Sequence, residues 1–423
     1  MRLSFVLPFL VALALPQPAL AQIAVADSGD TGWMILSALL VLLAALPGLM
    51  LRHAGKVNVR NALSVSAQGA SVAAVAMLSW AIAGYSIAYA PGSTWLGGGS
   101  NLMLANLGEL RDGLTVPESA FVLFQLSLAV LAACLLVGAV AERTRIGWWI
   151  AFTPIWILLV YAPIAHAVWG GGWLADLGVM DFAGGLVLHG TAGFSALALA
   201  LIAGARREPS GSGHTLLLSL TGGALLWIGL SGAVGGWALG ATDDAATAIL
   251  NHLFAACAAA LVWALLDRLL SARTSATGIL SGALAGVAAI SASAALVGVG
   301  GAMLIGLIAA IVARIGTGLL SGRVDDGASV FAIHGLGGMT GVLLLPVFVL
   351  PLMGGVGFDA NITLSGALTS QAIGLIVVAL WAMVGSAIAA LLVSVAIPMR
   401  VSAQVESDGL DASQHGQQGW DFR

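Results

Sequence analysis

Two histidines stand inside long apolar runs of a chain that carries little charge. His189 lies in the stretch LVLHGTAG and His334 in the stretch FAIHGLGG. Both stretches read as three apolar residues, histidine, glycine, two further residues and glycine. An ionisable side chain in a membrane span is costly, so by default it marks a site or a pathway. The matched pair therefore predicts one site at the interface of two repeats.

A narrow apolar passage lined by neutral imidazoles could select for a small weak base. A bare cation loses its hydration when it enters hydrocarbon, whereas a neutral molecule of similar size loses far less. Desolvation favours the uncharged form of a histidine ring. Two neutral rings can share one N–H···N bond, which leaves outward nitrogens for a passing molecule or for relay of a proton. Ammonium fits this chemistry because it can release a proton and cross as ammonia.

Other interpretations of the histidines remain open. They could be unrelated residues, each hydrogen-bonded to a backbone carbonyl of a neighbouring helix. A metal site would need further ligands, and an intramembrane acid–base enzyme would need a nucleophile or a metal cluster. No cysteine or carboxylate lies within one helical turn of either histidine. We therefore expect no metal, no cofactor and no enzymatic activity.

The elements that position the histidines are expected to be membrane helices. Charged residues make up 8% of the chain and apolar residues 60%, which no ordinary soluble domain shows. Many segments approach the ~20 apolar residues that cross a bilayer core. The net charge of −4 gives no indication of a nucleic-acid partner. We predict an all-α polytopic protein with eleven transmembrane helices, at residues 33–51, 62–90, 121–140, 147–168, 181–204, 215–240, 248–270, 276–297, 299–320, 329–352 and 369–398.

The distribution of positive charge predicts the topology. Lysine and arginine gather in alternate loops, and Arg111 stands alone in the loops between them. This asymmetry favours an N-out, C-in orientation. Spans one to five and six to ten would then form two inverted five-helix repeats, followed by a final helix. The apolar run 276–320 contains one turn signal, the glycine cluster at 297–301, and we divide it there.

The two ends of the chain differ from the spans. Residues 1–21 have a positive start, an apolar core and a small-x-small site, which predicts a cleaved signal peptide. Residues 22–400 would form the transmembrane domain. Residues 401–423 are polar and have no apolar period, which is typical of a solvated, often disordered tail. We interpret them as a cytoplasmic regulatory tail.

Several separated motifs resemble those of one transporter family. These are VGAVAER at 137–143, PIAHAVWGGG at 163–172, DFAGGLVLH at 181–189, RVDD at 323–326 and DGLD at 408–411. They resemble the Amt/Mep/Rh ammonium transporter family, and the bacterial Amt branch in particular. The resemblance implies a homotrimer in the bacterial inner membrane, with one pore per subunit for ammonium, ammonia or methylammonium. The tail resembles those of transporters regulated by a PII-type signal protein.

The resemblance also implies roles for individual residues. His189 and His334 correspond to the family's twin pore histidines. Asp181 matches an aspartate that shapes the outer binding region, but its place at a helix start equally fits an N-cap. Trp169 matches the tryptophan that recruits the cation at the outer site. The alternative for Trp169 is a residue of the interfacial aromatic belt.

The chain departs from the family pattern at the outer gate. Leu128 and Ala233 stand where two stacked phenylalanines usually close the pore. Trp237 replaces an outer-site serine, and Ser291 stands where a threonine is common. On the first span, RHA at 52–54 replaces an aromatic-aromatic-glycine pattern.

The remaining histidines are expected to be structural. We interpret His166, in the outer motif, as a structural residue. We interpret His53, His214 and His252 as loop or interface residues, because each lies near the end of a predicted span.

Two hypotheses about function follow. In the first, ammonium collects near Trp169, Trp237 and Asp181, loses its proton and passes the histidines as ammonia. In the second, the altered gate conducts little, and the protein is an ammonium sensor whose tail signals to a cytoplasmic partner. The first predicts flux and the second predicts ligand binding with negligible flux.

Overall fold

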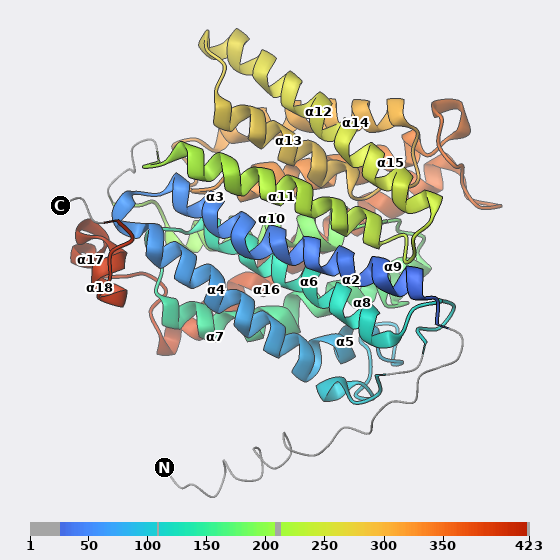
Figure 1. Cartoon of the computed structure of the whole chain (residues 1–423), viewed down its shortest axis with the longest axis horizontal. Coiled ribbons are helices and arrows are strands. Elements are labelled where there is room, and N and C mark those ends of the chain that lie inside the picture. Colours follow the sequence, from blue (N-terminus) through green and yellow to red (C-terminus); the bar gives the residue numbers. More distant parts are fainter. Residues whose placement is uncertain (1–25, 108–109, 208–212, 421–423) are drawn as a thin grey trace, which may run out of the picture.

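The fold is a bundle of helices that run beside one another along the long axis of the molecule (Figure 1). The computed structural model describes residues 26–107, 110–207 and 213–420. Within those ranges there is no β-strand, only isolated bridges between single residues. The all-α prediction is therefore confirmed. The predicted signal peptide, residues 1–21, lies outside the described residues.

The helices coincide with the predicted spans. The described ranges contain ten helical stretches long and apolar enough to cross a membrane, and the shorter apolar helix α13 lies at the predicted eighth span. The number of true crossings and their orientation remain predictions. The helices are α2 (Ser28–Leu43), α3 (Leu49–Lys56), α4 (Ala62–Ser79), α5 (Tyr85–Tyr89), α6 (Glu118–Ala139), α7 (Ile146–Trp156), α8 (Ala162–Trp169), α9 (Trp173–Asp176), α10 (Thr191–Ala203), α11 (Leu216–Gly236), α12 (Asp243–Ser271), α13 (Ala276–Ile290), α14 (Val299–Leu320), α15 (Gly337–Phe348), α16 (Leu364–Ala396), α17 (Ala403–Asp408) and α18 (Leu410–His415).

The long apolar run between α13 and α14 breaks earlier than the glycine cluster predicted. Helix α13 ends at Ile290, and α14 begins directly after Gly298. The connecting backbone is buried, so its polar groups need partners within the protein. The side-chain amide of Asn251 on α12 donates to the carbonyls of Ala294 and Val297, both at 2.8 Å. Backbone N–H groups of Phe182 and Ala183 bind the carbonyls of Ala292 and Ser291, so together with Asn251 they let an apolar sequence turn with its carbonyls paired.

The two histidine helices cross at glycines of the repeated motif. One is the π-helical turn η7 (Gly185–Gly190) continued by α10, and the other is η8 (Phe331–Leu336) continued by α15. A side chain on Gly193 would collide with the backbone of Gly335, and one on Gly338 would lie 2.9 Å from Cβ of His189. Small residues at such crossings let helix backbones approach closely. The motif glycines therefore set how near the histidines lie.

The polar tail is folded onto the bundle, which differs from the solvated chain expected. Its helices α17 and α18 lie together at one end of the molecule, near the start of α4 (Figure 1). Asp411 accepts from the backbone N–H groups of Leu63 and Ser64 at 3.1 and 2.7 Å. Leu410 donates its N–H to the side chain of Asn61 at 2.8 Å. These contacts satisfy the free amides at the start of α4 and give the tail its order.

Candidate functional site

The rings of His189 and His334 lie against each other in the centre of the bundle. Their Nδ1 atoms are 3.1 Å apart, their ring centroids 5.1 Å apart, and their planes differ by 15°. His189 has no exposed surface and His334 is 3% exposed. The structure thus brings together the two residues that the repeated motif singled out.

Ser291 determines the direction of hydrogen-bond donation through this pair. Its hydroxyl donates to the carbonyl of Val287 at 2.9 Å, which uses its one hydrogen. Nε2 of His189, 3.2 Å from the same oxygen, therefore donates to it. In neutral rings Nδ1 of His189 then accepts, and Nδ1 of His334 donates to it. The chain of donation runs from His334 through His189 to Ser291 and leaves Nε2 of His334 as an acceptor.

A carboxylate holds the start of each histidine helix. The two oxygens of Asp181 accept from the backbone N–H groups of residues 184, 185, 186 and 187 at 2.6–3.0 Å. Asp326 accepts from the N–H of Phe331 at 2.8 Å at the start of η8. Each aspartate precedes its histidine by eight residues in the sequence. That equal spacing identifies Asp326 as the counterpart of Asp181, a role that was not predicted from the sequence.

The contacts of Asp181 are those of an N-cap. Both of its oxygens are occupied by backbone amides, and its side chain is 8% exposed. Capping groups of this kind satisfy the free N–H groups of a first helical turn. The carboxylate therefore fixes the first turn of the histidine helix.

An aromatic group lies beside Asp181. Trp169 donates its indole N–H to the backbone carbonyl of Asp181 at 2.8 Å. Its ring centroid is 4.2 Å from that of Trp237, and Trp237 in turn meets Phe124 edge-on at 6.0 Å. Trp169 and Trp237 are half-buried, whereas Phe124 is fully buried. The group combines indole faces with the oriented carboxylate nearby.

The aromatic group is displaced by one turn from the usual gate positions. Leu128 and Ala233 are both fully buried on α6 and α11. Phe124 precedes Leu128 by four residues, and Trp237 follows Ala233 by four residues. Since Phe124 and Trp237 touch, both helices shift their aromatic side chain toward the same end of the bundle. Trp237 was singled out from the sequence, whereas Phe124 was not, because its spacing from Leu128 gains meaning only once its contact with Trp237 is known.

Two of the histidines interpreted as loop or interface residues are buried in helices, so that interpretation was wrong for them. His53 is 4% exposed on α3, and its Nε2 fills the space beside Gly138 of α6. His252 is fully buried on α12 and contacts the carbonyl of Trp227 through Nε2 at 3.0 Å. Both sit near the ends of their spans in sequence, but neighbouring helices cover them.

The other two histidines fit their interpretations. His214 lies in a connecting segment and contacts the carbonyl of Val57 at 3.1 Å. His166 is buried, with Nδ1 3.0 Å from the carbonyl of Ala88 and Nε2 2.8 Å from that of Ser93. It ties α8 to the segment that follows α5, which is a structural role.

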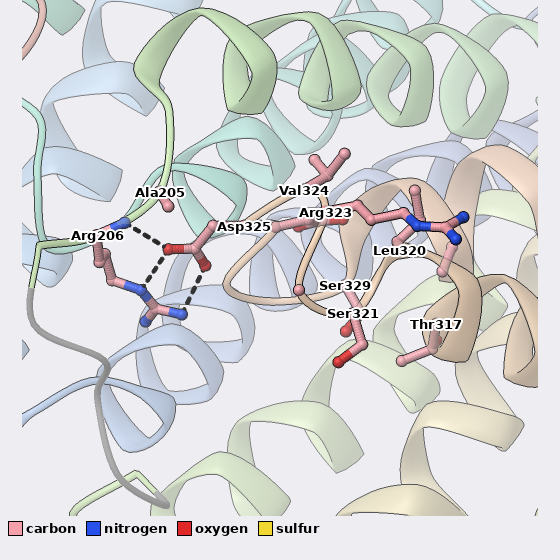
Figure 2. Close-up of a pocket in the computed structure, with 12 residues that line it drawn as sticks. Ala205, Arg206, Thr317, Leu320, Ser321, Arg323, Val324, Asp325 and Ser329 are labelled. Carbon is pink, nitrogen blue, oxygen red and sulfur yellow. Dashed lines mark hydrogen bonds and ion pairs between the residues drawn. The ribbon is translucent and has the colours of Figure 1, made fainter.

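A cavity of about 500 Å³ lies near the start of η8 and is lined by Asp326 among others (Figure 2). Arg206 crosses it to Asp325, donating from its backbone N–H at 2.8 Å, from Nε at 2.9 Å and from Nη2 at 2.7 Å. Arg206 also pairs with Glu142. Burial would raise the pKa of Asp325, but the hydrogen bonds from Arg206 outweigh it and hold that pKa below its ordinary value.

A family comparison decides what this arrangement belongs to. The model of the Ammonium Transporter Family matches residues 32–420. The chain belongs to this ammonium transporter family. A putative ammonium transporter of Methanothermobacter thermautotrophicus is 36% identical over 406 residues, and the alignment covers 93% of this chain and 98% of the relative. The ammonium transporter of Bacillus subtilis is 34% identical, with 93% and 98% covered.

Structural similarity agrees with the family. The solved structure of a protein named Sensor Amt Protein superposes with a TM-score of 0.85 at 28% identity, covering 92% of this chain and 98% of that chain. The Amt resemblance carried by the histidine, aspartate and tryptophan motifs is therefore confirmed. The family membership identifies a multi-pass membrane protein of the ammonium transporter type.

Proposed function

We propose that this protein moves ammonium across the bacterial inner membrane, through a pore in each subunit. The observation that carries the proposal is the buried pair of His189 and His334, joined Nδ1 to Nδ1 and continued to Ser291. Membership of the ammonium transporter family supports the choice of substrate. Relatives named as transporters also support a protein without enzymatic activity.

The outer aromatic group would collect the cation. The faces of Trp169 and Trp237 lie together at the end of the bundle where Asp181 caps η7. Indole faces attract ammonium-type cations, and the attraction grows as water is removed. The negative charge of Asp181 adds to it at a distance, because both carboxylate oxygens already accept from backbone amides. Ammonium would lose its proton in passing from this group to the interior.

The histidine pair would then select for the neutral molecule. Ammonia can donate to the free acceptor Nε2 of His334 and can accept from ring N–H groups as they reorient. A sodium or potassium ion meets no carboxylate among the hydrogen-bond partners of the pair in the described residues, so its desolvation would go uncompensated. The pair offers hydrogen bonds in place of hydration to a molecule that can shed its charge.

The assembly and its regulation form part of the same proposal. We infer a homotrimer with N-out and C-in orientation, a cleaved signal peptide at 1–21 and a cytoplasmic tail from residue 401. Leu261 and Leu269 on α12 are 72% and 71% exposed, which suits lipid or a neighbouring subunit. The docked tail lies beside the loops near the inner cavity, where a PII-type signal protein would bind.

Uptake of labelled methylammonium tests the transport proposal. Wild type, His189→Ala and His334→Ala are expressed in cells that lack other ammonium transporters, with His214→Ala as the matched control in a connecting segment. We expect uptake to fall at least tenfold in the first two variants and to persist in the control. If cells with the wild-type protein take up no more methylammonium than cells without it, the transport proposal is refuted.

A sensor is the second candidate, and the gate favours it. Leu128 and Ala233 leave the usual gate positions without aromatic rings. A receptor of this kind would bind ammonium saturably, with negligible flux, and would change the exposure of its tail. Calorimetric titration of purified protein with ammonium, run beside the uptake assay, separates the two candidates. Binding without uptake selects the sensor.

A further inference from the structure

An unpaired positive side chain lies within the bundle on the inner side of the histidine pair. Arg52 is on α3 and is 3% exposed. Its Nη2 has no hydrogen-bond partner in the part of the chain that the structure describes. Within the same ranges no carboxylate forms an ion pair with it. A buried charge without a partner is expensive, so a chain that keeps one in a membrane span invites a functional explanation.

Arg52 lies where α3 packs against α11. Its Nη1 lies next to Gly223 of α11, where a side chain would come within 3.0 Å of it. The neighbouring His53 fills the space beside Gly138 of α6. The charge of Arg52 acts on the ring of His334. Arg52 therefore stands within electrostatic reach of the inner histidine.

A second positive side chain lies on α3, closer to the inner end of the bundle than Arg52. Lys56 follows Arg52 by one helical turn on α3 and donates to the carbonyl of Ala328, just ahead of η8, at 3.4 Å. Asp326 interacts with Lys56 and caps η8, and Glu142 accepts from the backbone N–H of Asn58, two residues after Lys56. No carboxylate lies within ion-pair distance of Arg52 in the described residues. The charge of Arg52 is thus left uncompensated next to the histidine pair.

We propose that Arg52 sets the charge selectivity of the pore, as a fixed positive barrier on the inner side of the histidine pair that admits ammonia and stops ammonium and the proton. The inference rests on the transport function proposed above and names the species that crosses. A positive residue in a constriction excludes protons and other cations from a pore while neutral molecules pass. Nothing comparable acts on ammonia, which carries no net charge.

The proposed cycle conserves atoms and charge. At the outer aromatic group one N–H bond of ammonium breaks, its electron pair stays on nitrogen, and the proton returns to the outer water. Ammonia crosses the histidine pair and passes Arg52. At the inner end nitrogen binds a proton from the cytoplasm and re-forms ammonium. One ammonium is lost outside and one gained inside, one proton is left outside and one removed inside, and no net charge crosses.

The size of the barrier follows from simple electrostatics. A unit charge roughly 10 Å from a passing cation, at an effective dielectric constant of about 20, slows that cation by roughly tenfold to twentyfold. We therefore expect removal of the charge at residue 52 to raise the current carried per ammonia moved by about tenfold. Restoring a positive charge at the same position should suppress the current again.

Proteoliposomes with two readouts test this inference. An internal pH dye follows ammonia entry, and solid-supported membrane electrophysiology follows charge movement. The proteins are wild type, Arg52→Leu, Arg52→Phe and Arg52→Lys, with Arg273→Leu as a control that removes an exposed arginine. Gel filtration and thermal unfolding confirm that each variant is folded. Two neutral variants are used so that a folding defect in one of them does not decide the result.

The expected result is a current per ammonia moved that is about tenfold lower in wild type, Arg52→Lys and the Arg273 control than in both neutral variants. A wild-type current equal, per ammonia moved, to that of Arg52→Leu overturns the barrier and leaves transport intact. If wild type moves no ammonia, the transport proposal fails by itself. The two neutral variants then test the barrier. An ammonium current through them supports it, and the absence of current in both overturns it.

Discussion

At the scale of single residues, one hydroxyl hydrogen fixes the state of the site. Ser291 gives that hydrogen to Val287, so its oxygen can only accept from His189. The tautomers of both rings follow from this choice. A threonine, common in the family at this position, carries the same hydroxyl, so the substitution keeps the hydrogen bond and removes a methyl group from the wall.

The first prediction concerns this hydroxyl. Ser291→Ala leaves the Nε2–H of His189 buried and unpaired, which costs about 1–3 kcal/mol and frees the ring tautomer. We expect methylammonium uptake to fall severalfold. Ser293→Ala is the matched control, because the hydroxyl of Ser293 is also buried but has no partner within the described residues. Equal uptake by the two variants would contradict the tautomer assignment.

The sequence predicted the histidine pair because charge is rare in apolar runs and the motif occurs twice. It did not predict how Asp181 would bond, since capping and ligand attraction need the same residue at the same place. The role of Phe124 was also hidden. One apolar residue among many on α6 carries no signal until its contact with Trp237 is known.

At the scale of elements, the two histidine helices touch where they carry glycine. The backbone of Gly335 occupies the space that a side chain on Gly193 would need. The repeated glycines stood out in the sequence, but their role in the crossing depends on which helices pack together. The sequence predicted the start of α14 at residue 299. It placed the end of α13 at residue 297 instead of Ile290, because the amide of Asn251 that supports the turn comes from another helix.

The second prediction follows from the crossing. Gly193→Ala forces the helices apart, and overpacking of this kind costs about 1–3 kcal/mol. We expect a lower unfolding temperature in detergent and reduced uptake, because the histidine rings separate. Gly300→Ala on α14 is the control, since a side chain there meets nothing within 4 Å. That variant should unfold at or above the wild-type temperature.

The third prediction is a pH dependence of the inner loops. The pKa of Asp325 is depressed in the folded protein, so its pairing with Arg206 stabilises the fold above the ordinary aspartate pKa of about 3.9. This stability is lost as pH falls below that value and through the folded-state pKa. Between pH 5 and about pH 3, the thermal unfolding temperature should fall more steeply in wild type than in Asp325→Asn. Parallel curves would contradict this pairing.

At the scale of the whole molecule, the tail links distant parts of the chain. Glu406 binds the backbone N–H of Arg207 at 2.7 Å and the guanidinium of Arg400 at 2.8 Å. It thereby joins the loop after α10 to the end of α16. The polar composition of the tail predicted a solvated segment, because these long-range contacts leave no periodic pattern.

The fourth prediction tests this docking. Glu406→Gln removes the negative charge between the two arginines, so α17 should detach more often. Limited proteolysis of inside-out vesicles should cleave the tail severalfold faster than in wild type. Asp408→Asn, at an exposed position whose contact is to Gln404 within the tail, should be cleaved at the wild-type rate. Equal protection of both variants would show that the ion pairs do not hold the tail.

The contact between Gly193 and Gly335 has a consequence for how the protein would work as a machine. One half of the chain cannot rock against the other while the two backbones meet with no side chain between them. Transport would then need no large conformational change, and the pore would keep a constant width. The rate should therefore climb only gently on warming, with an Arrhenius slope closer to that of diffusion in water than to that of a carrier.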